Sequence, residues 1–322
     1  MIYDCFTFFN ELDLLDLRLN ILYEYVDKFV IVEGNKTHTG KDKEFILEAN
    51  FNRFEKFRDK IIYIKVEFPD SPEHRDKYGN NWFYENYQRD SIMQGLIACN
   101  PNDIIIISDC DEIIRPECIK KYKSGIYSLK QLNIYYKYNS LNIGDMYSKK
   151  AKMCQYKDLL DPKQELNDLD YCKYSKYGLP TYLRFCKGKK LYNSGWHFSY
   201  ISDSKGILEK RNSIVEQQFN TKENMSLEKI EKMLAEGKDV LDRDIRYANL
   251  KLSDVLPQYL IDNKDSYSSL INFKNQISFP HAILKSLIYK NCSIRHKGGN
   301  IYGKKYLRFF GINIELPARS NL

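Results

Sequence analysis

The chain has 322 residues, a mass of 38.2 kDa and a formal net charge of +7. Hydrophobic residues make up 43% of it and charged residues 29%, which excludes a wholly disordered chain. Acidic and basic residues are interleaved through most of the sequence, which argues against a dedicated nucleic-acid surface, while the mild positive charge favours an anionic substrate. The 26 tyrosines suit a ligand with sugar or base rings, and an AT-rich genome would produce the same surplus.

The eight cysteines have no C-x-x-C spacing, which argues against a structural zinc site and a disulfide scaffold. The first residues lack a basic segment followed by an apolar one. No stretch of the sequence is long and apolar enough to cross a bilayer. We therefore expect a soluble cytoplasmic protein.

The first hundred residues alternate strand and helix patterns, which is typical of a wound parallel sheet. A further strand at residues 103–108 contains four consecutive isoleucines and is predicted to be central in the sheet. Residues 67–81 are expected to form a polar loop. The other expected strands are 2–8, 28–33 and 61–66, and the expected helices are 12–22, 51–57 and 82–99.

Beyond Pro116 the pattern changes, and it predicts a mixed extension of the same sheet. Strands are expected at 126–138, 182–186 and 191–200, and helices at 226–234 and 256–262. From residue 286 onward, lysines and arginines mix with aromatic residues. Two interpretations of this tail are open: contact with an anionic membrane surface or acceptor, and an ordinary solvated face with a few packed rings.

A cluster of acids, Asp109-Cys110-Asp111-Glu112, follows the isoleucine-rich strand directly. In open α/β sheets, ligands bind beyond the carboxyl ends of the strands, where these acids would lie. Because side chains alternate along an extended chain, we expect Asp109 and Asp111 to point to one side and share a cation. The alternative is a solvated acidic loop before a helix that starts near Pro116.

A second informative segment is G-W-H-F-S at residues 195–199. The imidazole of His197 beside two carboxylates is a suitable ligand set for a divalent cation such as Mn²⁺, with diphosphate oxygens and water completing the shell. The alternative is a hydrogen-bonded structural histidine. Trp196 would either stack on a sugar face or pack in the core, and the same alternatives apply to Tyr135 and Tyr136.

Two charged residues nearer the N-terminus are candidates for nucleotide binding. Glu33 ends a strand and precedes the polar loop 35–40, where a base or ribose could dock, or the segment is a simple turn. Glu85 and Arg89 are four residues apart on a predicted helix. Arg89 therefore either forms a plain ion pair or faces the nucleotide.

Together these segments resemble glycosyltransferase family 17. The resemblance runs in one linear order from about residue 2 to residue 270, and several rare segments recurring in order make it specific. The matching segments are Y-D-C-F at 3–6 with N-E at 10–11, F-V-I-V-E at 29–33 with T-G at 39–40, Trp82, Glu85, Q-R-D at 88–90, S-D-C-D-E-I at 108–113, G-W-H at 195–197 with Ser199, and L-P-Q-Y-L at 256–260 with Asn263.

The resemblance implies an α/β fold of the GT-A type, a Rossmann-like nucleotide-diphospho-sugar transferase with a mixed, mainly parallel central sheet. It implies a metal-dependent inverting glycosyltransferase that moves N-acetylglucosamine from UDP-GlcNAc to a hydroxyl of a glycan acceptor, with Mn²⁺ or Mg²⁺. The implied metal ligands are Asp109, Asp111 and His197. The residues expected to bind the nucleotide sugar are Glu33, Arg89, Asp109 and Trp196.

An inverting displacement also needs a general base for the acceptor hydroxyl. Asp145 follows the Tyr-rich strand in a loop that contains glycine, a suitable position to face an acceptor. The other candidates are Glu112, Asp168 and Asp170. We expect a GT-A domain at 1–280, with a nucleotide-sugar half at about 1–115 and an acceptor half at about 116–280, followed by a basic aromatic extension at 281–322.

Two other functions are open. A metal-dependent phosphohydrolase would be expected to carry an acid cluster at its first strand, where Asp4 stands alone. A non-catalytic nucleotide-sugar-binding module would bind the donor without extending any glycan.

Overall fold

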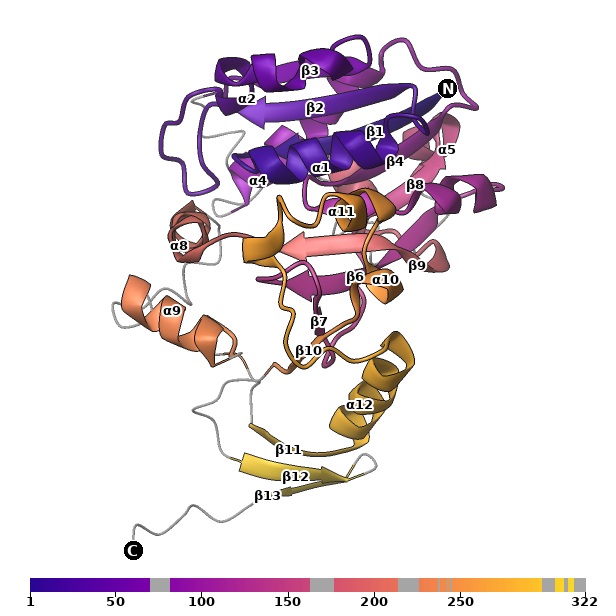
Figure 1. Ribbon diagram of the computed structural model, residues 1–322. Coiled ribbons are helices and arrows are strands. Elements are labelled where there is room, and N and C mark those ends of the chain that lie inside the picture. Colours follow the sequence, from indigo (N-terminus) through magenta and orange to yellow (C-terminus); the bar gives the residue numbers. More distant parts are fainter. Residues whose placement is uncertain are drawn as a thin grey trace, which may run out of the picture. The chain divides into compact units, whose positions relative to one another are not determined.

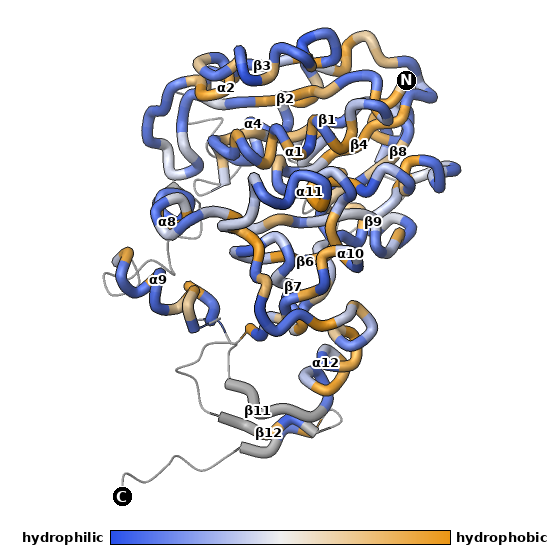
Figure 2. Tube along the Cα trace, in the orientation of Figure 1, coloured by the Kyte–Doolittle hydropathy of each residue, from blue (hydrophilic) through white to orange (hydrophobic). Residues whose placement is uncertain are grey.

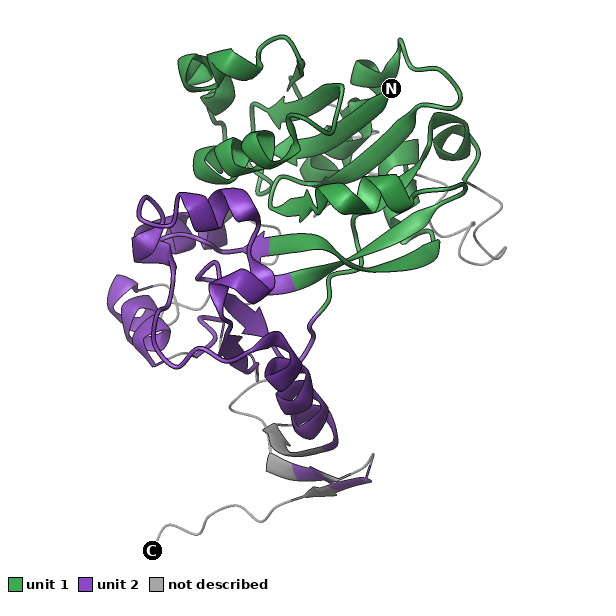
Figure 3. Ribbon diagram, turned by 45° about the vertical axis from the view of Figure 1, so that its right-hand side comes forward, with its two compact units in different colours: residues 1–132, 147–197, 213–215 green, residues 133–146, 198–212, 216–322 purple. Residues whose placement is uncertain are grey.

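The computed structural model describes residues 1–69, 82–162, 177–213, 226–236, 238–241, 243, 245–296, 305–309 and 312–315 (Figure 1). The chain divides into two compact units, coloured separately in Figure 3. Unit 1 comprises residues 1–132, 147–197 and 213–215, and unit 2 comprises residues 133–146, 198–212 and 216–322. The functional halves expected around residue 115 and the boundary at 280 stay predictions.

Four parallel strands form one part of the sheet in unit 1, in the order β3-β2-β1-β4. Their bounds are Ile2–Phe8 for β1, Lys28–Gly34 for β2, Ile61–Val66 for β3 and Ile104–Asp109 for β4. Ile105, Ile106 and Ile107 of β4 are fully buried. An apolar run is required where helices cover both faces of a parallel sheet, so the isoleucine-rich strand lies inside, as predicted.

Antiparallel strands continue the sheet within unit 1. β8 (Lys152–Gln155) pairs with β4, and the first residues of β6 (Tyr127–Tyr135) pair with β8. The short β5 (Glu112–Ile114) pairs antiparallel with β9 (Lys189–Ser199). The predicted α/β Rossmann-like fold with a mixed, mainly parallel sheet is therefore confirmed.

Of the helical segments of unit 1, those at 12–22 and 51–57 have the predicted bounds, whereas α2 (Ile46–Ala49) and α5 (Tyr156–Leu160) were not predicted. The helix expected at 82–99 consists of the shorter α4 (Phe83–Asp90) and a 3-10 segment, and the strand expected at 182–186 is wrong because these residues lie in α7 (Leu179–Phe185). Pro180 occupies the first turn of α7, where its missing N–H costs nothing. The remaining helical segments are α1 (Leu12–Leu22), η1 (Phe51–Phe57), η2 (Ser91–Leu96) and η3 (Pro116–Lys121).

Unit 2 contains β7 (Ser140–Asn142), which pairs antiparallel with β10 (Tyr247–Asn249) and with the end of β6. A buried carboxylate, Asp239, accepts hydrogen bonds from the hydroxyls of Tyr136 and Tyr247 and from the guanidinium of Arg243. The other elements are α8 (Ser204–Ser213), α9 (Leu227–Ala235), α10 (Leu252–Val255), α11 (Gln258–Asp262), η7 (Ser268–Leu270), α12 (Phe279–Asn291), β11 (Cys292–His296), β12 (Lys305–Phe309) and β13 (Ile312–Glu315).

Most of the expected polar loop, and the base candidates Asp168 and Asp170, lie outside the described residues. None of the helices within the described ranges combines the length and the apolar character that a bilayer crossing requires.

Candidate active site

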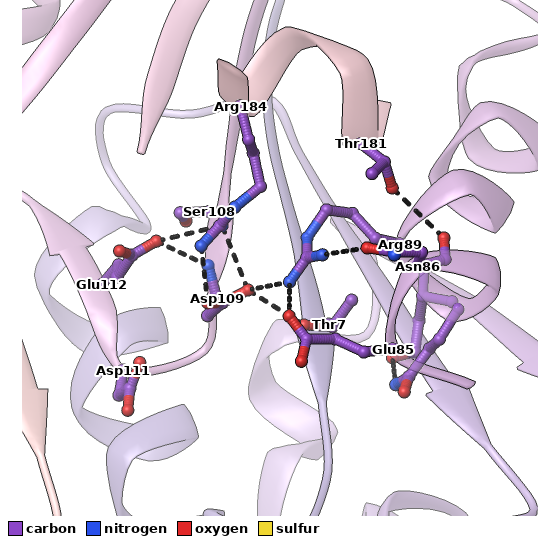
Figure 4. A network of polar contacts seen from close by, with 12 residues as sticks. Thr7, Glu85, Asn86, Arg89, Ser108, Asp109, Asp111, Glu112, Thr181 and Arg184 are labelled. Carbon is purple, nitrogen blue, oxygen red and sulfur yellow. Dashed lines mark hydrogen bonds and ion pairs between the residues drawn. The ribbon is translucent and has the colours of Figure 1, made fainter. Parts of the chain in front are cut away.

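The acidic cluster forms a turn at the carboxyl end of β4. The strand ends at Asp109, Cys110 and Asp111 form the turn itself, and β5 begins at Glu112 (Figure 4). Asp109 and Asp111 are therefore not alternate positions of one extended strand. The alternation that led us to expect both carboxylates on one side does not hold here.

A buried arginine supports this turn from within unit 1. Arg18 of α1 forms a two-point ion pair with Asp4 of β1, with N–O distances of 2.7 and 2.6 Å, and both side chains are fully buried. The Nη2 of Arg18, which also pairs with Asp4, donates to the Ser108 hydroxyl at 2.7 Å. Its Nη1 donates to three backbone carbonyls at the turn, those of Asp109, Cys110 and Glu112, at 2.8–3.2 Å. A buried guanidinium with all its donors used fixes the backbone of the turn.

The carboxylate of Asp109 is held by two arginines. Its Oδ1 accepts from Arg89 at 3.0 Å and from Arg184 at 3.1 Å, and its Oδ2 accepts from Arg184 at 2.9 Å (Figure 4). Desolvation raises the pKa of Asp109, but the charges of Arg184 and Arg89 outweigh it and hold the pKa well below its usual value. Asp109 is thus ionised and engaged by cations of the chain itself.

The helices that carry these arginines are fixed to the sheet and to each other. Gln88 of α4 donates to the backbone carbonyls of Phe8, the last residue of β1, and Val32, two residues before the end of β2. Asp90, at the end of α4, accepts from the backbone N–H groups of Gly178 and Thr181, which are the N-cap and third residue of α7. A carboxylate at a helix N-terminus satisfies donors that have no partner within the helix. Consecutive residues of α4 therefore anchor it, pair with Asp109 and orient the helix of Arg184.

The predicted base Glu112 is buried and engaged by the protein. Its carboxylate accepts from the Asp109 backbone N–H at 3.1 Å, the Ser148 hydroxyl at 3.2 Å and Arg184 at 3.3 Å. These contacts are typical of a group that shapes the turn. Asp145, the other described candidate, is exposed and belongs to unit 2.

The second acid of the turn faces a histidine. The pairing of β5 with β9 aligns Glu112 with His197, and it brings His197 Nε2 to 3.7 Å from Asp111 Oδ1. Figure 4 shows Asp111 apart from the arginine network. The predicted approach of His197 to one of the two aspartates is therefore found in the structure.

Gly195 makes this approach possible. Its φ is +139°, and an added Cβ would lie 2.1 Å from the Ile113 carbonyl oxygen, 2.8 Å from the Arg115 nitrogen and 2.9 Å from Ile114 Cα. All three are backbone atoms of β5 or its next residue, which a side chain cannot displace cheaply. Trp196 is 1% exposed, and the Arg115 guanidinium lies 4.4 Å from its ring. This tryptophan packs in the core, which leaves its proposed stacking on a sugar without support from this structure.

The donor set at Asp111 and His197 fits a cation. Two ligands that each lie about 2.1 Å from one ion are roughly 3–4 Å apart, and the distance here is 3.7 Å. Within the described ranges, no group of three or more His, Cys, Asp or Glu side chains is arranged to hold a metal ion. The structure thus brings together two side chains that could serve as ligands, and a metal role for Asp109, Asp111 and His197 stays a prediction.

The region that contains the acidic turn is similar to a known protein family. The sequence model of glycosyltransferase family 17 matches residues 1–156, which contain the turn, Arg18 and Arg89. The match covers just under half of the chain, and through this region the chain is similar to glycosyltransferase family 17. The resemblance to this family that the sequence predicted is therefore confirmed over residues 1–156.

Curated relatives of the chain carry the name beta-1,4-mannosyl-glycoprotein 4-beta-N-acetylglucosaminyltransferase. The rat protein is 24% identical over 297 residues, which cover 81% of this chain and 53% of the relative. The human protein is 33% identical over 111 residues, which cover 32% of this chain and 20% of the relative. The longer alignment thus spans only about half of its relative.

Two solved structures show weak similarity. A putative glucose-1-phosphate thymidylyltransferase from Bacillus anthracis has a TM-score of 0.34 and 11% identity, with 61% of this chain and 88% of that chain covered. The mannosyltransferase PcManGT from Pyrobaculum calidifontis, solved with GDP-Man and Mn²⁺, has a TM-score of 0.35 and 11% identity, with 89% and 72% covered.

The carboxylate of Glu33 is surrounded by hydrogen-bond donors of the chain itself. The side chain is fully buried, and its carboxylate accepts from Lys43, from the backbone N–H groups of Ile46 and Leu47, and from the Tyr63 hydroxyl. Four protein donors satisfy both oxygens and cap α2. A role of Glu33 in nucleotide binding therefore has no support from its contacts.

Three residues of the site were not identified from the sequence. Arg184 was assigned to a strand, and Arg18 and Asp90 were not recognised as partners of the turn and of α7. Asp4 and the segment 88–90 matched the family, but nothing in the local sequence indicated that Asp4 pairs with Arg18 or that Asp90 caps another helix. Only long-range pairing reveals these roles.

Proposed function

We propose that this chain is a metal-dependent inverting glycosyltransferase that moves N-acetylglucosamine from UDP-GlcNAc to a hydroxyl of a glycan acceptor. The observation that carries the proposal is the pair Asp111–His197 beside the arginine-bound Asp109, at the carboxyl end of a central strand in a family 17 region. In α/β sheets this edge is where ligands bind. The names of the relatives supply the donor sugar and the type of acceptor.

Asp111 and His197 would hold Mn²⁺ or Mg²⁺ in this reaction. When bound, the cation supplies positive charge to the donor diphosphate as the sugar–phosphate bond breaks. Neutral imidazole and carboxylate are suitable ligands, and the remaining coordination positions would go to diphosphate oxygens and water.

Arg89 and Arg184 would stabilise negative charge near the diphosphate. Both are almost completely buried, and Asp109 and neighbouring carboxylates fix their guanidinium groups in position. Cations that are oriented before the reaction stabilise developing charge without reorganising at that moment. In this proposal Asp109 contributes by orienting the two arginines.

The general base is proposed to be Asp145, with Glu112 as the alternative. Asp145 is exposed, and the Asn142 side chain accepts from its backbone N–H, which closes the turn that presents it. An exposed carboxylate can accept the proton of an acceptor hydroxyl, whereas Glu112 already accepts three hydrogen bonds from the protein. Asp145→Asn should lower the turnover of acceptor while donor binding stays unchanged.

The first experiment is a thermal-shift screen of sugar nucleotides with and without Mn²⁺. A ligand that binds only the native state raises the melting temperature according to its concentration and affinity. We expect UDP-GlcNAc with Mn²⁺ to give the largest increase, and neither component alone to reproduce it. A larger increase with another sugar nucleotide would reject the proposed donor.

The second experiment is a transfer assay with UDP-GlcNAc and a panel of glycan acceptors. We expect EDTA to stop transfer and added Mn²⁺ to restore it, and full activity in chelator would reject metal dependence. Donor hydrolysis that no acceptor converts into transfer would favour a phosphohydrolase. Donor binding without either product would favour a non-catalytic binding module.

A further inference from the structure

The helix α12 of unit 2 exposes its large aliphatic residues. Ile283, Leu284, Leu287 and Ile288 are 40%, 55%, 53% and 52% exposed. The residues of α12 that are buried are Ala282, Ser286 and Tyr289. At 3.6 residues per turn, the four aliphatic side chains occupy a continuous arc of about 140° around the helix.

This arrangement is the reverse of a normal surface helix. A helix on a globular protein usually buries its leucines and isoleucines and exposes its polar residues. Here two of the three buried side chains are small, and the large apolar residues face outward along the helix, which appears as an apolar stretch interrupted by polar positions in Figure 2. A contiguous exposed apolar patch marks a surface for interaction.

The same part of the sequence carries the positive charge of the chain. Residues 266–314 contain eight lysines and arginines and no aspartate or glutamate. The positive charge of this segment therefore exceeds the formal net charge of +7 of the whole chain. Two of these residues, Lys285 and Lys290, are exposed on α12 itself. By helical geometry they lie on opposite borders of the apolar arc, where long basic side chains can extend toward anionic groups while their carbon stems cover apolar surface.

We propose that α12 binds the surface of an anionic membrane, with the arc formed by Ile283, Leu284, Leu287 and Ile288 inserted at the boundary of headgroups and acyl chains. An apolar arc flanked by lysines is the pattern of helices that lie in the plane of a membrane. Each basic residue near an anionic leaflet adds to the attraction. This inference is independent of the proposed transfer reaction, because α12 contains none of the residues assigned to it.

Other occupants fit the observations less well. A nucleic acid would account for the basic residues, but it would leave four aliphatic side chains in water. A second copy of the chain would bring two surfaces of the same positive charge together, which opposes association. An anionic bilayer satisfies both the apolar arc and the charge.

The test is vesicle flotation of the full chain. We expect binding to vesicles of phosphatidylcholine with about one third phosphatidylglycerol, and at least tenfold weaker binding to phosphatidylcholine alone. Binding should fall at ~0.5 M NaCl, where charges are screened over a few ångströms. Equal binding to both kinds of vesicle, or to neither, would overturn the proposal.

Variants separate the apolar and electrostatic contributions. Leu284→Ser with Leu287→Ser should weaken binding at least tenfold, while Ile97→Ser, at an 85% exposed position of unit 1, should leave it unchanged. Lys285→Gln with Lys290→Gln should weaken binding to the anionic vesicles by about fivefold per charge. Circular dichroism and thermal melting should be the same for all variants.

Three results would contradict membrane insertion. Binding that only the lysine variant weakens would indicate attraction by charge alone. A dimer in light scattering that Leu284→Ser with Leu287→Ser dissociates, without vesicle binding by the unmodified chain, would identify a self-association surface. Retention on heparin or RNA without vesicle binding would identify a nucleic-acid surface.

Discussion

Asp109 and Asp111 are separated by one residue, but the two sides of their turn are built differently. On the arginine side, Asp109, Glu112 and Glu85 pair with Arg89 and Arg184, so each carboxylate has a cationic partner within the chain. On the histidine side, Asp111 faces His197, which carries no permanent positive charge. The difference teaches that one D-x-D pattern can combine a carboxylate with a structural task and a carboxylate suited to a cation.

We expect the largest loss of stability from removing Arg18, because its side chain supports the backbone of the whole turn. Arg18→Met leaves the buried Asp4 without its partner and three turn carbonyls without a donor. Loss of one member of a buried ion pair costs about 3–5 kcal/mol, and we expect a loss of this size in the free energy of unfolding. Urea titration of Arg18→Met and Asp4→Asn measures it. A loss below about 1 kcal/mol in both would show that the pair does not stabilise the turn.

The next effect concerns the histidine side alone. Gly195→Ala places a Cβ against the backbone of β5 at a φ that L-residues avoid, and we expect a loss of about 2–4 kcal/mol in unfolding free energy. Gly125→Ala is the matched control, because Gly125 also has a positive φ but an added Cβ would meet only the end of the Lys189 side chain at 3.7 Å. The control should lose about 1 kcal/mol. Equal losses in urea titrations would reject the close approach of β5 and β9.

Substituting each aspartate of the turn tests whether Asp109 and Asp111 have different roles. Asp111→Asn should lower transfer at least about 100-fold and weaken Mn²⁺ binding, with the unfolding free energy changed by less than about 1 kcal/mol. Asp109→Asn should retain Mn²⁺ binding and lose about 1–2 kcal/mol of stability, because two buried guanidinium groups lose a charged partner. Calorimetric titration with Mn²⁺ and urea titration of both variants provide the measurements. Loss of Mn²⁺ binding in Asp109→Asn would restore the set of three ligands.

The smallest expected effect depends on pH. Burial of the Lys152 ammonium, together with the positive charges of Lys130 and Arg184 nearby, lowers its pKa from the ordinary value of 10.5 to about 8. Below pH 8 the folded state must hold the charged form, so Lys152 lowers stability there, and this cost disappears as the pH rises from about 8 to 10.5. The stability advantage of Lys152→Met over the unmodified chain should shrink by about 3 kcal/mol across this range.

Urea titrations of the two proteins at several pH values between 7 and 10.5 measure this advantage. The difference between variant and unmodified chain removes the titration of buried cysteines, which both proteins share. A difference that does not change with pH would show that Lys152 titrates like a solvated lysine.

Local patterns were sufficient for the strands that build the site. The bounds of β1 and β3 agree with those expected from apolar runs between polar breaks, and β4 lies one residue from its expected position. A parallel strand buried on both faces must be apolar throughout, so its signal is contained in its own residues. The position of the acidic turn followed from the strand before it.

The partners of the acids could not be deduced in the same way. Arg184 lies on a helix of seven residues whose start depends on Asp90, a residue of another helix. Such a short helix has little intrinsic stability, and tertiary contacts decide its structure. The approach of His197 to Asp111 was expected from the resemblance to the family. The pairing of Asp109 with two arginines was not expected, because no local pattern connects these arginines to it.

The three carbonyl oxygens that Arg18 binds have a consequence for ligand entry. The turn cannot shift its register without withdrawing acceptors from a guanidinium that water does not reach. Its geometry is therefore set when the protein folds, before any donor arrives. Binding at this edge should require little loss of backbone freedom, and more of the interaction energy is then left for affinity.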